Sequence, residues 1–148
     1  MLVEDLMVTE LVTCERDASL QTAAERMLER GVGSVIVLRG GNPYGIVTET
    51  DALQAGATTK RPFVDVSVER AVSHPLVTTT GDTTIRTAVN RMKEHDIKKL
   101  PVVDGTTLRG LVTRTDIVSH YDDFIAEAHA LDQRREQWEA RKQDIDEF

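Results

Sequence analysis

The stretch GIVTETD at residues 45–51 returns as GLVTRTD at residues 110–116. Each copy begins with glycine and two aliphatic residues and ends in Thr-x-Thr-Asp, which predicts a strand that leads directly into a helix. An aspartate at the start of a helix can cap that helix or contact a bound ligand, because unpaired backbone N–H groups gather there. Two copies in one short chain indicate an internal repeat.

The repeat extends well beyond the motif. With an offset of 65 residues, residues 3–53 align with residues 68–118 without a gap, and 18 of 51 positions are identical. Self-similarity at a fixed period sets the architecture, because each repeat is one structural unit. A unit of roughly 50–60 residues is marginally stable alone, so we expect the two units to bury their sheets against each other.

Each repeat predicts the same order of elements: strand, helix, strand, strand, helix. Ser19 and Thr84 are the expected N-caps of the first helices, and Gly31 and Asp96 stand at their ends. Turn residues then separate two further strands in each repeat. The predicted strands are Leu11–Thr13, Ser34–Leu38 and Gly45–Thr48, then Leu76–Thr78, Leu100–Val103 and Leu108–Thr113. The predicted fold class is α+β, with two repeats packed sheet to sheet.

Composition and charge argue against several classes of function. A net charge of −7 and an aromatic content of 4 % speak against nucleic-acid and anionic membrane partners. Cys14 is the single cysteine, the four histidines lack metal-ligand spacing, and no nucleophile–base pair is apparent. The longest apolar run, residues 34–38, is too short to cross a bilayer. We therefore expect a cytoplasmic protein that is not an enzyme and holds no metal.

Four stretches resemble the tandem cystathionine-β-synthase (CBS) domain, in the paired form called a Bateman module. They are the two motif copies, KKLPVVDG at residues 98–105 and HPLVTTTGDTTI at residues 74–85. The resemblance covers about residues 1–120. It implies a flat disc with two clefts that bind adenosine-containing ligands (AMP, ADP, ATP or S-adenosylmethionine), with magnesium entering only beside phosphates. It also implies a non-catalytic regulatory homodimer that signals to a partner protein.

The resemblance implies that each cleft pairs the motif of one repeat with the early strand of the other. The motif's aspartate would hold the ribose and its threonines would lie near ribose or phosphate, which suits a carboxylate and a helix N-terminus. The first expected cleft combines Ile46, Thr48, Thr50 and Asp51 with Leu76, Val77, Thr78, Lys98, Lys99 and Pro101. The second combines Leu111, Thr113, Arg114, Thr115 and Asp116 with Leu11, Val12, Thr13, Gly33, Ser34 and Ile36.

Simpler explanations stand beside these. Asp51 and Asp116 can be ordinary helix-start acids, and Lys98 and Lys99 can be a solvated strand edge. The first repeat has GSVIVL where the second has KKLPVV, so the clefts differ in charge, and we expect ATP or ADP to prefer the Asp51 cleft. The alternative function is a structural or dimerisation module with vestigial clefts. An enzyme or a nucleic-acid binder on the same scaffold is the weaker rival.

The chain is expected to divide into repeat 1 (1–56), a linker (57–66), repeat 2 (67–121) and a tail (122–148). The tail has neither glycine nor proline and predicts a helix. Spacings of four and three residues define a coiled-coil-like seam, interrupted by two bases: Phe124, Ala128, Leu131, Arg135, Trp138, Lys142 and Ile145. Because the seam holds the only tryptophan, we expect it to pack against its own disc or a second copy rather than to dock a foreign partner.

Overall fold

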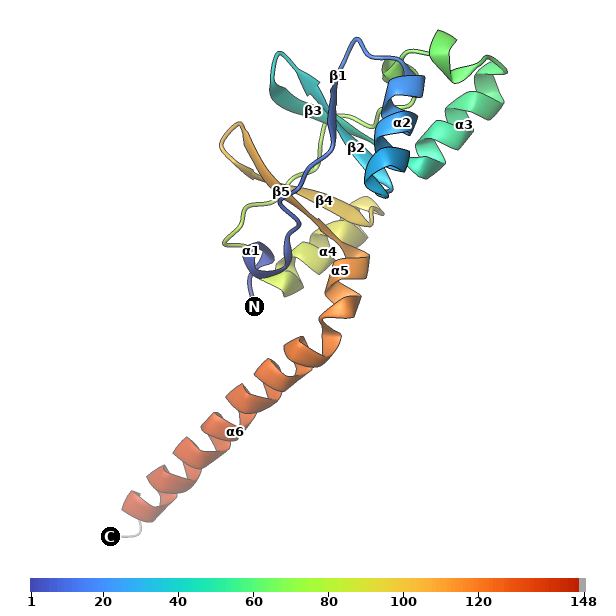
Figure 1. Ribbon diagram of the computed structural model, residues 1–148. Coiled ribbons are helices and arrows are strands. Elements are labelled where there is room, and N and C mark those ends of the chain that lie inside the picture. The colour runs from blue at the N-terminus through green and yellow to red at the C-terminus, as the bar shows by residue number, and fades with distance from the viewer. Residues whose placement is uncertain (147–148) are drawn as a thin grey trace.

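Two small sheets lie side by side, each covered by helices, and a long helix leaves the body at one end (Figure 1). The computed structural model describes the backbone of residues 1–146 and the side-chain surroundings of residues 1–123 and 125–142. Because each sheet has one helix layer, the two sheets bury their remaining apolar surface toward each other, as the repeat predicts.

The first repeat forms a three-stranded sheet in the order β1-β2-β3. β1 pairs parallel to β2, and β2 forms an antiparallel hairpin with β3. Along the chain a short helix comes first, and the order strand, helix, strand, strand, helix follows it. The elements are α1 (Val3–Leu6), β1 (Thr13–Glu15), α2 (Leu20–Arg30), β2 (Ser34–Arg39), β3 (Asn42–Thr48) and α3 (Glu49–Thr59).

The second repeat forms a two-stranded hairpin of β4 and β5. Two short 3₁₀ turns, η1 (Phe63–Asp65) and η2 (Val68–Arg70), connect it to the first repeat. Its other elements are α4 (Ile85–His95), β4 (Lys99–Asp104), β5 (Thr107–Thr113), α5 (Arg114–Ser119) and α6 (Tyr121–Asp146). Both predicted hairpins are therefore confirmed.

The predicted ends of the first helix in each repeat are confirmed. The hydroxyls of Ser19 and Thr84 accept hydrogen bonds from the backbone N–H groups of Thr22 and Thr87. Each of these caps is worth about 1 kcal/mol relative to alanine. Gly31 and Asp96 end the helices in the left-handed conformation, with φ of 63° and 51°.

The predicted early strands were wrong in part. β1 begins two residues later than expected, and Leu76–Thr78 is not a strand, because only Thr79 forms a bridge, to Val102. In the first repeat, the N–H of Ile36 donates to the carbonyl of Val12 at 2.9 Å. The corresponding residue in the second repeat is Pro101, which has no N–H to donate. The ladder beside residues 76–78 therefore lacks a bond that its counterpart has.

The two repeats exchange their leading segments. Val3 and Leu6 of α1 lie in the core around α4 and β4, while Val68 lies in the core around α2 and β2. Val8 pairs with Leu111 across the repeats, and the backbone of Ser73 pairs with Ile46 in the same way. Each sequence repeat thus completes the other's core, so neither can keep its packing without its neighbour.

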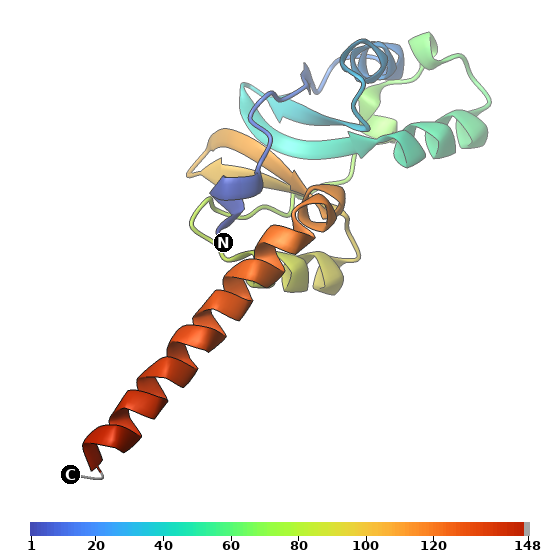
Figure 2. The same cartoon turned by 60° about the horizontal axis from the view of Figure 1, so that its bottom comes forward.

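Helix α6 projects away from the body as a continuous rod (Figure 2). Every side chain described between residues 125 and 142 is exposed, so the seam does not pack against its own disc over these residues, and its packing against a second copy stays a prediction. The surroundings of the seam residues Phe124 and Ile145 lie outside the described part. Nowhere in residues 1–146 does a helix combine the length and the apolar character needed to cross a membrane.

Candidate functional site

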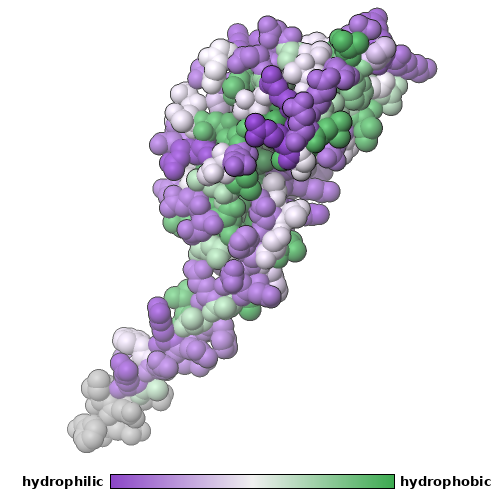
Figure 3. All heavy atoms as spheres, viewed as in Figure 1, coloured by the Kyte–Doolittle hydropathy of each residue, from purple (hydrophilic) through white to green (hydrophobic). Residues whose placement is uncertain are grey.

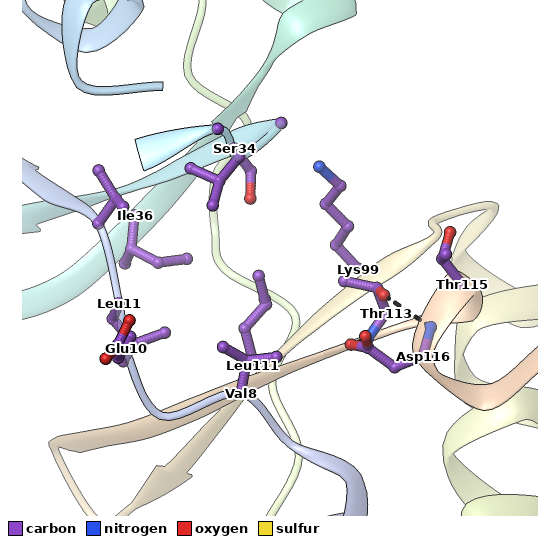
Figure 4. A pocket seen from close by; sticks show the side chains of 14 residues that line it. Val8, Glu10, Leu11, Ser34, Ile36, Lys99, Leu111, Thr113, Thr115 and Asp116 are labelled. Carbon is purple, nitrogen blue, oxygen red and sulfur yellow. Dashed lines mark hydrogen bonds between the residues drawn. The ribbon is translucent and has the colours of Figure 1, made fainter. Parts of the chain in front are cut away.

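A cleft of about 360 Å³ lies between the two repeats, which we call the Asp116 cleft (Figure 4). Its walls come from the leading segment of the first repeat, the turn after α2, the start of β2, and the junction of β5 with α5. Lys99, at the start of β4, completes it. The lining residues are Val8, Glu10, Leu11, Val12, Gly31, Val32, Gly33, Ser34, Ile36, Lys99, Leu111, Thr113, Thr115 and Asp116.

The threonine and aspartate of the motif form a capping box at the start of α5. The backbone N–H of Asp116 donates to Oγ1 of Thr113, and the N–H of Thr113 donates to Oδ2 of Asp116, both at 3.1 Å. Oδ1 of Asp116 makes no hydrogen bond within the described residues, and the side chain is half-buried. The motif therefore serves as a helix cap and still leaves one carboxylate oxygen available to a ligand.

The first repeat builds the same capping box at the start of α3. The N–H of Thr48 donates to Oδ2 of Asp51 at 2.9 Å, and the N–H of Asp51 donates to Oγ1 of Thr48 at 3.2 Å. Both aspartates therefore cap the start of a helix, as the simpler explanation predicts. It does not exclude a contact between either carboxylate and a ligand.

Lys99 is the single base among the residues that line the Asp116 cleft, which also include the carboxylates of Glu10 and Asp116. Figure 4 shows its side chain reaching past Thr113 toward β2. Burial lowers the pKa of Lys99, and the negative charges of Glu49 and Asp51 oppose that shift. With two carboxylates and one ammonium among its lining residues, the cleft carries a slight excess of negative charge.

Lys99 was expected in the Asp51 cleft, and the structure places it among the residues that line the Asp116 cleft. Its ammonium nevertheless lies close to the first repeat's motif. A methyl group added to Gly33 would lie 2.8 Å from Nζ of Lys99 and 3.4 Å from Oε1 of Glu49. The absence of a side chain at Gly33 leaves room for the lysine to reach between the two repeats.

The residues expected around Asp51 are divided in the structure. Leu76 and Thr78 line a separate cleft of about 370 Å³ beside Tyr44, His74 and Val103, at the turns of the two hairpins. Asp51 lines neither this cleft nor the Asp116 cleft. The carbonyl of Lys98 accepts a hydrogen bond from the N–H of Arg114 at 2.8 Å, and Pro101 is buried. Ile46 is engaged with Ser73 as described above, and Val77 packs against the second core.

Most of the expected Asp116 set comes together as predicted. Leu11, Val12, Gly33, Ser34 and Ile36 meet the motif residues Leu111, Thr113, Thr115 and Asp116. Thr13 and Arg114 are not among the lining residues: Thr13 pairs with Ile36 in the sheet, and Arg114 is exposed on α5. The sequence interpretation missed Val8, Glu10, Gly31 and Val32. The first two directly precede Leu11, so extending the leading segment by three residues would have found them.

Comparison with known proteins gives three findings. A family model described as CBS domain matches residues 3–58 and 67–123. The uncharacterized protein MJ1404 of Methanocaldococcus jannaschii is 31 % identical over 135 residues, which are 82 % of this chain and 32 % of that protein. The CBS domain-containing protein YhcV of Bacillus subtilis is 31 % identical over 116 residues, 78 % of this chain and 81 % of YhcV. The chain thus spans about a third of the length of MJ1404.

Among solved structures, one similar chain is the CBS domain pair of the protein MJ0100 in complex with 5′-methylthioadenosine and S-adenosyl-L-methionine. It has a TM-score of 0.75 and 23 % sequence identity, and the match covers 83 % of this chain and 97 % of that one. At this level of identity the likeness shows the fold.

Proposed function

This chain belongs to the CBS domain family, and from that premise we propose that it is a regulatory module that binds an adenosine-containing ligand between its repeats. The observation that carries the proposal is the Asp116 cleft, where a free carboxylate oxygen, apolar walls and one ammonium converge. The bound adenosine ligands of the similar MJ0100 structure support it.

Each part of the cleft matches one part of an adenosine ligand. The side chains of Leu11, Ile36 and Leu111 offer an apolar slot for the adenine ring. Oδ1 of Asp116 can accept from a ribose hydroxyl, as the acidic residue of dinucleotide-binding folds does. Lys99 can reach a phosphate or carboxylate group at the 5′ end of the ligand. All of these roles are binding roles, and none of them breaks a covalent bond of the ligand.

The charge of the cleft favours a ligand with little negative charge. The lining of the cleft includes two carboxylates, Glu10 and Asp116, and one ammonium, Lys99, so a triphosphate would meet net repulsion. Methylthioadenosine is neutral and S-adenosylmethionine carries a cationic sulfonium group. We therefore rank methylthioadenosine, S-adenosylmethionine and AMP above ATP at the Asp116 cleft. Any preference for ATP or ADP stays assigned to the motif of the first repeat.

A second site at Asp51 remains part of the proposal. The first repeat forms the same capping box as the second. Its expected set is Ile46, Thr48, Thr50 and Asp51 with Leu76, Val77, Thr78, Lys98, Lys99 and Pro101. A ligand held by both Asp51 and the segment of Leu76 and Thr78 would bridge the two repeats and favour one relative arrangement of them. A ligand with higher affinity for one arrangement would shift the population toward it, and a regulated partner protein would respond to that shift.

Calorimetry with adenosine, methylthioadenosine, S-adenosylmethionine, AMP and ATP tests the proposal. Asp116→Asn keeps an oxygen for the capping box but loses the charged acceptor, so it should weaken adenosine binding at least tenfold. Asp51→Asn makes the same change in the equivalent capping box and serves as the matched control. Loss of binding in Asp116→Asn alone supports the Asp116 cleft, while loss in Asp51→Asn alone assigns the binding to the other motif.

The competing function is a structural module whose clefts bind nothing. A ligand that binds only the folded state raises the melting temperature. If none of the five compounds changes the melting temperature at millimolar concentration, the binding proposal fails and the structural function gains support.

A further inference from the structure

Lys99 carries the single positive charge among the residues that line the Asp116 cleft, and its surroundings decide what that charge can bind. The side chain is half-buried, and within the described part of the chain its ammonium forms no ion pair. Nζ occupies the space beside Gly33, 2.8 Å from where a methyl group on that residue would lie. An ammonium in this position can bind an anion in the cleft or stay beside a carboxylate of the protein.

That carboxylate belongs to Glu49, the residue between the two threonines of the first motif. Its Oε1 lies 3.4 Å from the same methyl position at Gly33, so both charged atoms lie around one point. The backbone fixes this arrangement, because the N–H of Glu49 donates to the carbonyl of Gly33 at 3.1 Å. Burial lowers the pKa of Lys99, and the negative charge of Glu49 is the larger of the two that oppose this shift. Glu49 therefore acts on Lys99 although it does not itself line the Asp116 cleft.

The second repeat has the same backbone arrangement with the opposite charge. Arg114 holds the matching position in the second motif, and its N–H donates to the carbonyl of Lys98 at 2.8 Å. Lys98 is the counterpart of Gly33 in the repeat. The residue between the threonines is thus tied to the start of a strand hairpin in its own repeat. For Glu49 that point lies on the cleft of the other repeat, because Gly33 and Asp116 line the same cleft.

Hydrophilic side chains cover much of the surface seen in Figure 3, so an exposed carboxylate such as Glu49 affects a site only where the fold holds it close. We propose that Glu49 is a specificity-determining residue of the Asp116 cleft, a role that rests on the proposed function. It holds the ammonium of Lys99 toward the first repeat. A phosphate has to draw that ammonium away from Glu49, whereas a neutral adenosine ligand does not. Glu49 is therefore a positioning residue that weakens the binding of phosphate-bearing ligands.

Calorimetry on the full chain tests this role. Glu49→Gln removes the charge and keeps the size of the side chain, so AMP should bind about threefold more tightly or better, while adenosine should bind as before. In a Lys99→Met background the same substitution should change neither affinity. Asp104→Asn removes an equal charge at the other end of β4, about 17 Å from Lys99 at 3.3 Å per residue, and should also change neither. A gain in AMP affinity that persists in the Lys99→Met background would mean that Glu49 repels phosphate directly, which overturns the positioning role.

A second measurement needs no ligand. The pKa of Lys99 is read from an NMR titration of the methylene carbon next to its ammonium, with the signal identified by its loss in Lys99→Met. Glu49→Gln should lower this pKa further, because a negative charge that favours the ammonium is removed, and Asp104→Asn should leave it unchanged. An unchanged pKa in Glu49→Gln, or an unchanged ratio of AMP to adenosine affinity, overturns the inference while the adenosine site stands. If adenosine binds to none of these proteins, the proposed function fails and this role fails with it.

Discussion

Gly45, the first residue of the repeated motif, lies against the segment that leads into the second repeat. A methyl group on its Cα would lie 2.5 Å from Cγ2 of Val72 and 2.6 Å from the carbonyl oxygen of Ser73. Ordinary van der Waals contact begins at 3.4 Å, so the backbone of Ser73 would have to retreat by about 0.8 Å. That backbone is held by two hydrogen bonds with Ile46, of 3.2 and 2.9 Å, so it cannot move freely.

We expect Gly45→Ala to lower the free energy of unfolding by about 2–4 kcal/mol. Overpacking of a core costs about 1–3 kcal/mol, and weakening the two hydrogen bonds without breaking them adds about 1 kcal/mol in total. For a chain of this size the melting temperature should fall by about 4–16 °C. Urea unfolding followed by circular dichroism measures the free energy directly.

Two further glycines provide matched controls, because the same substitution meets different neighbours. At Gly33 the added methyl crowds the flexible end of Lys99 at 2.8 Å and meets Glu49 at ordinary contact distances, so Gly33→Ala should change stability by less than about 0.5 kcal/mol. At Gly110 it meets the flexible Met7 at 2.8 Å and the carbonyl oxygen of Val8 at 3.0 Å, so an intermediate loss is expected. If Gly45→Ala is as stable as Gly33→Ala, close backbone approach is not the reason for the motif's glycine.

Three other predictions concern the site and the core. Lys99→Met should weaken AMP binding about fivefold or more and adenosine binding less than twofold in calorimetry; equal losses would mean that Lys99 only shapes the cleft. Because burial lowers the pKa of Lys99, its ammonium loses its proton at a lower pH than that of an ordinary lysine. The preference for AMP over adenosine should therefore fade as the pH rises into that range. Burial raises the pKa of the Cys14 thiol above 9.0, so its stabilising effect is complete below the unfolded pKa and is lost as pH rises through the folded value. The wild type should therefore lose more stability than Cys14→Ala above about pH 9, and parallel pH profiles would contradict this. Thr113→Ala removes the acceptor of the Asp116 N–H and should cost about 1 kcal/mol in urea unfolding, whereas Thr113→Ser should restore it.

The sequence determined the features that depend on neighbours along the chain. Helix caps at Ser19 and Thr84, the helix ends at Gly31 and Asp96, and both hairpins follow from local backbone preferences and hydrophobic spacing. The family resemblance added the pairing of one repeat's motif with the other's leading segment. In the structure Leu11 and Val12 line the same cleft as Thr113 and Asp116. Pro101 has no N–H group, so the sequence already contained the reason why residues 76–78 do not form a strand. Only the structure identified the missing hydrogen bond, because it shows the bond from Ile36 to Val12 in the first repeat.

The tertiary structure alone decided how distant segments meet. The sequence could not place Val3 in the second core and Val68 in the first, because both repeats have the same apolar pattern and either core accepts either valine. The position of Lys99 depended on the empty space over Gly33 and on the carboxylates of Glu49 and Asp51. Seam spacing predicted the helix of the tail, but the direction in which α6 leaves the body depends on its junction with α5. Local pattern fixes what each segment forms, whereas the approach of two sheets fixes which side chains share a cleft.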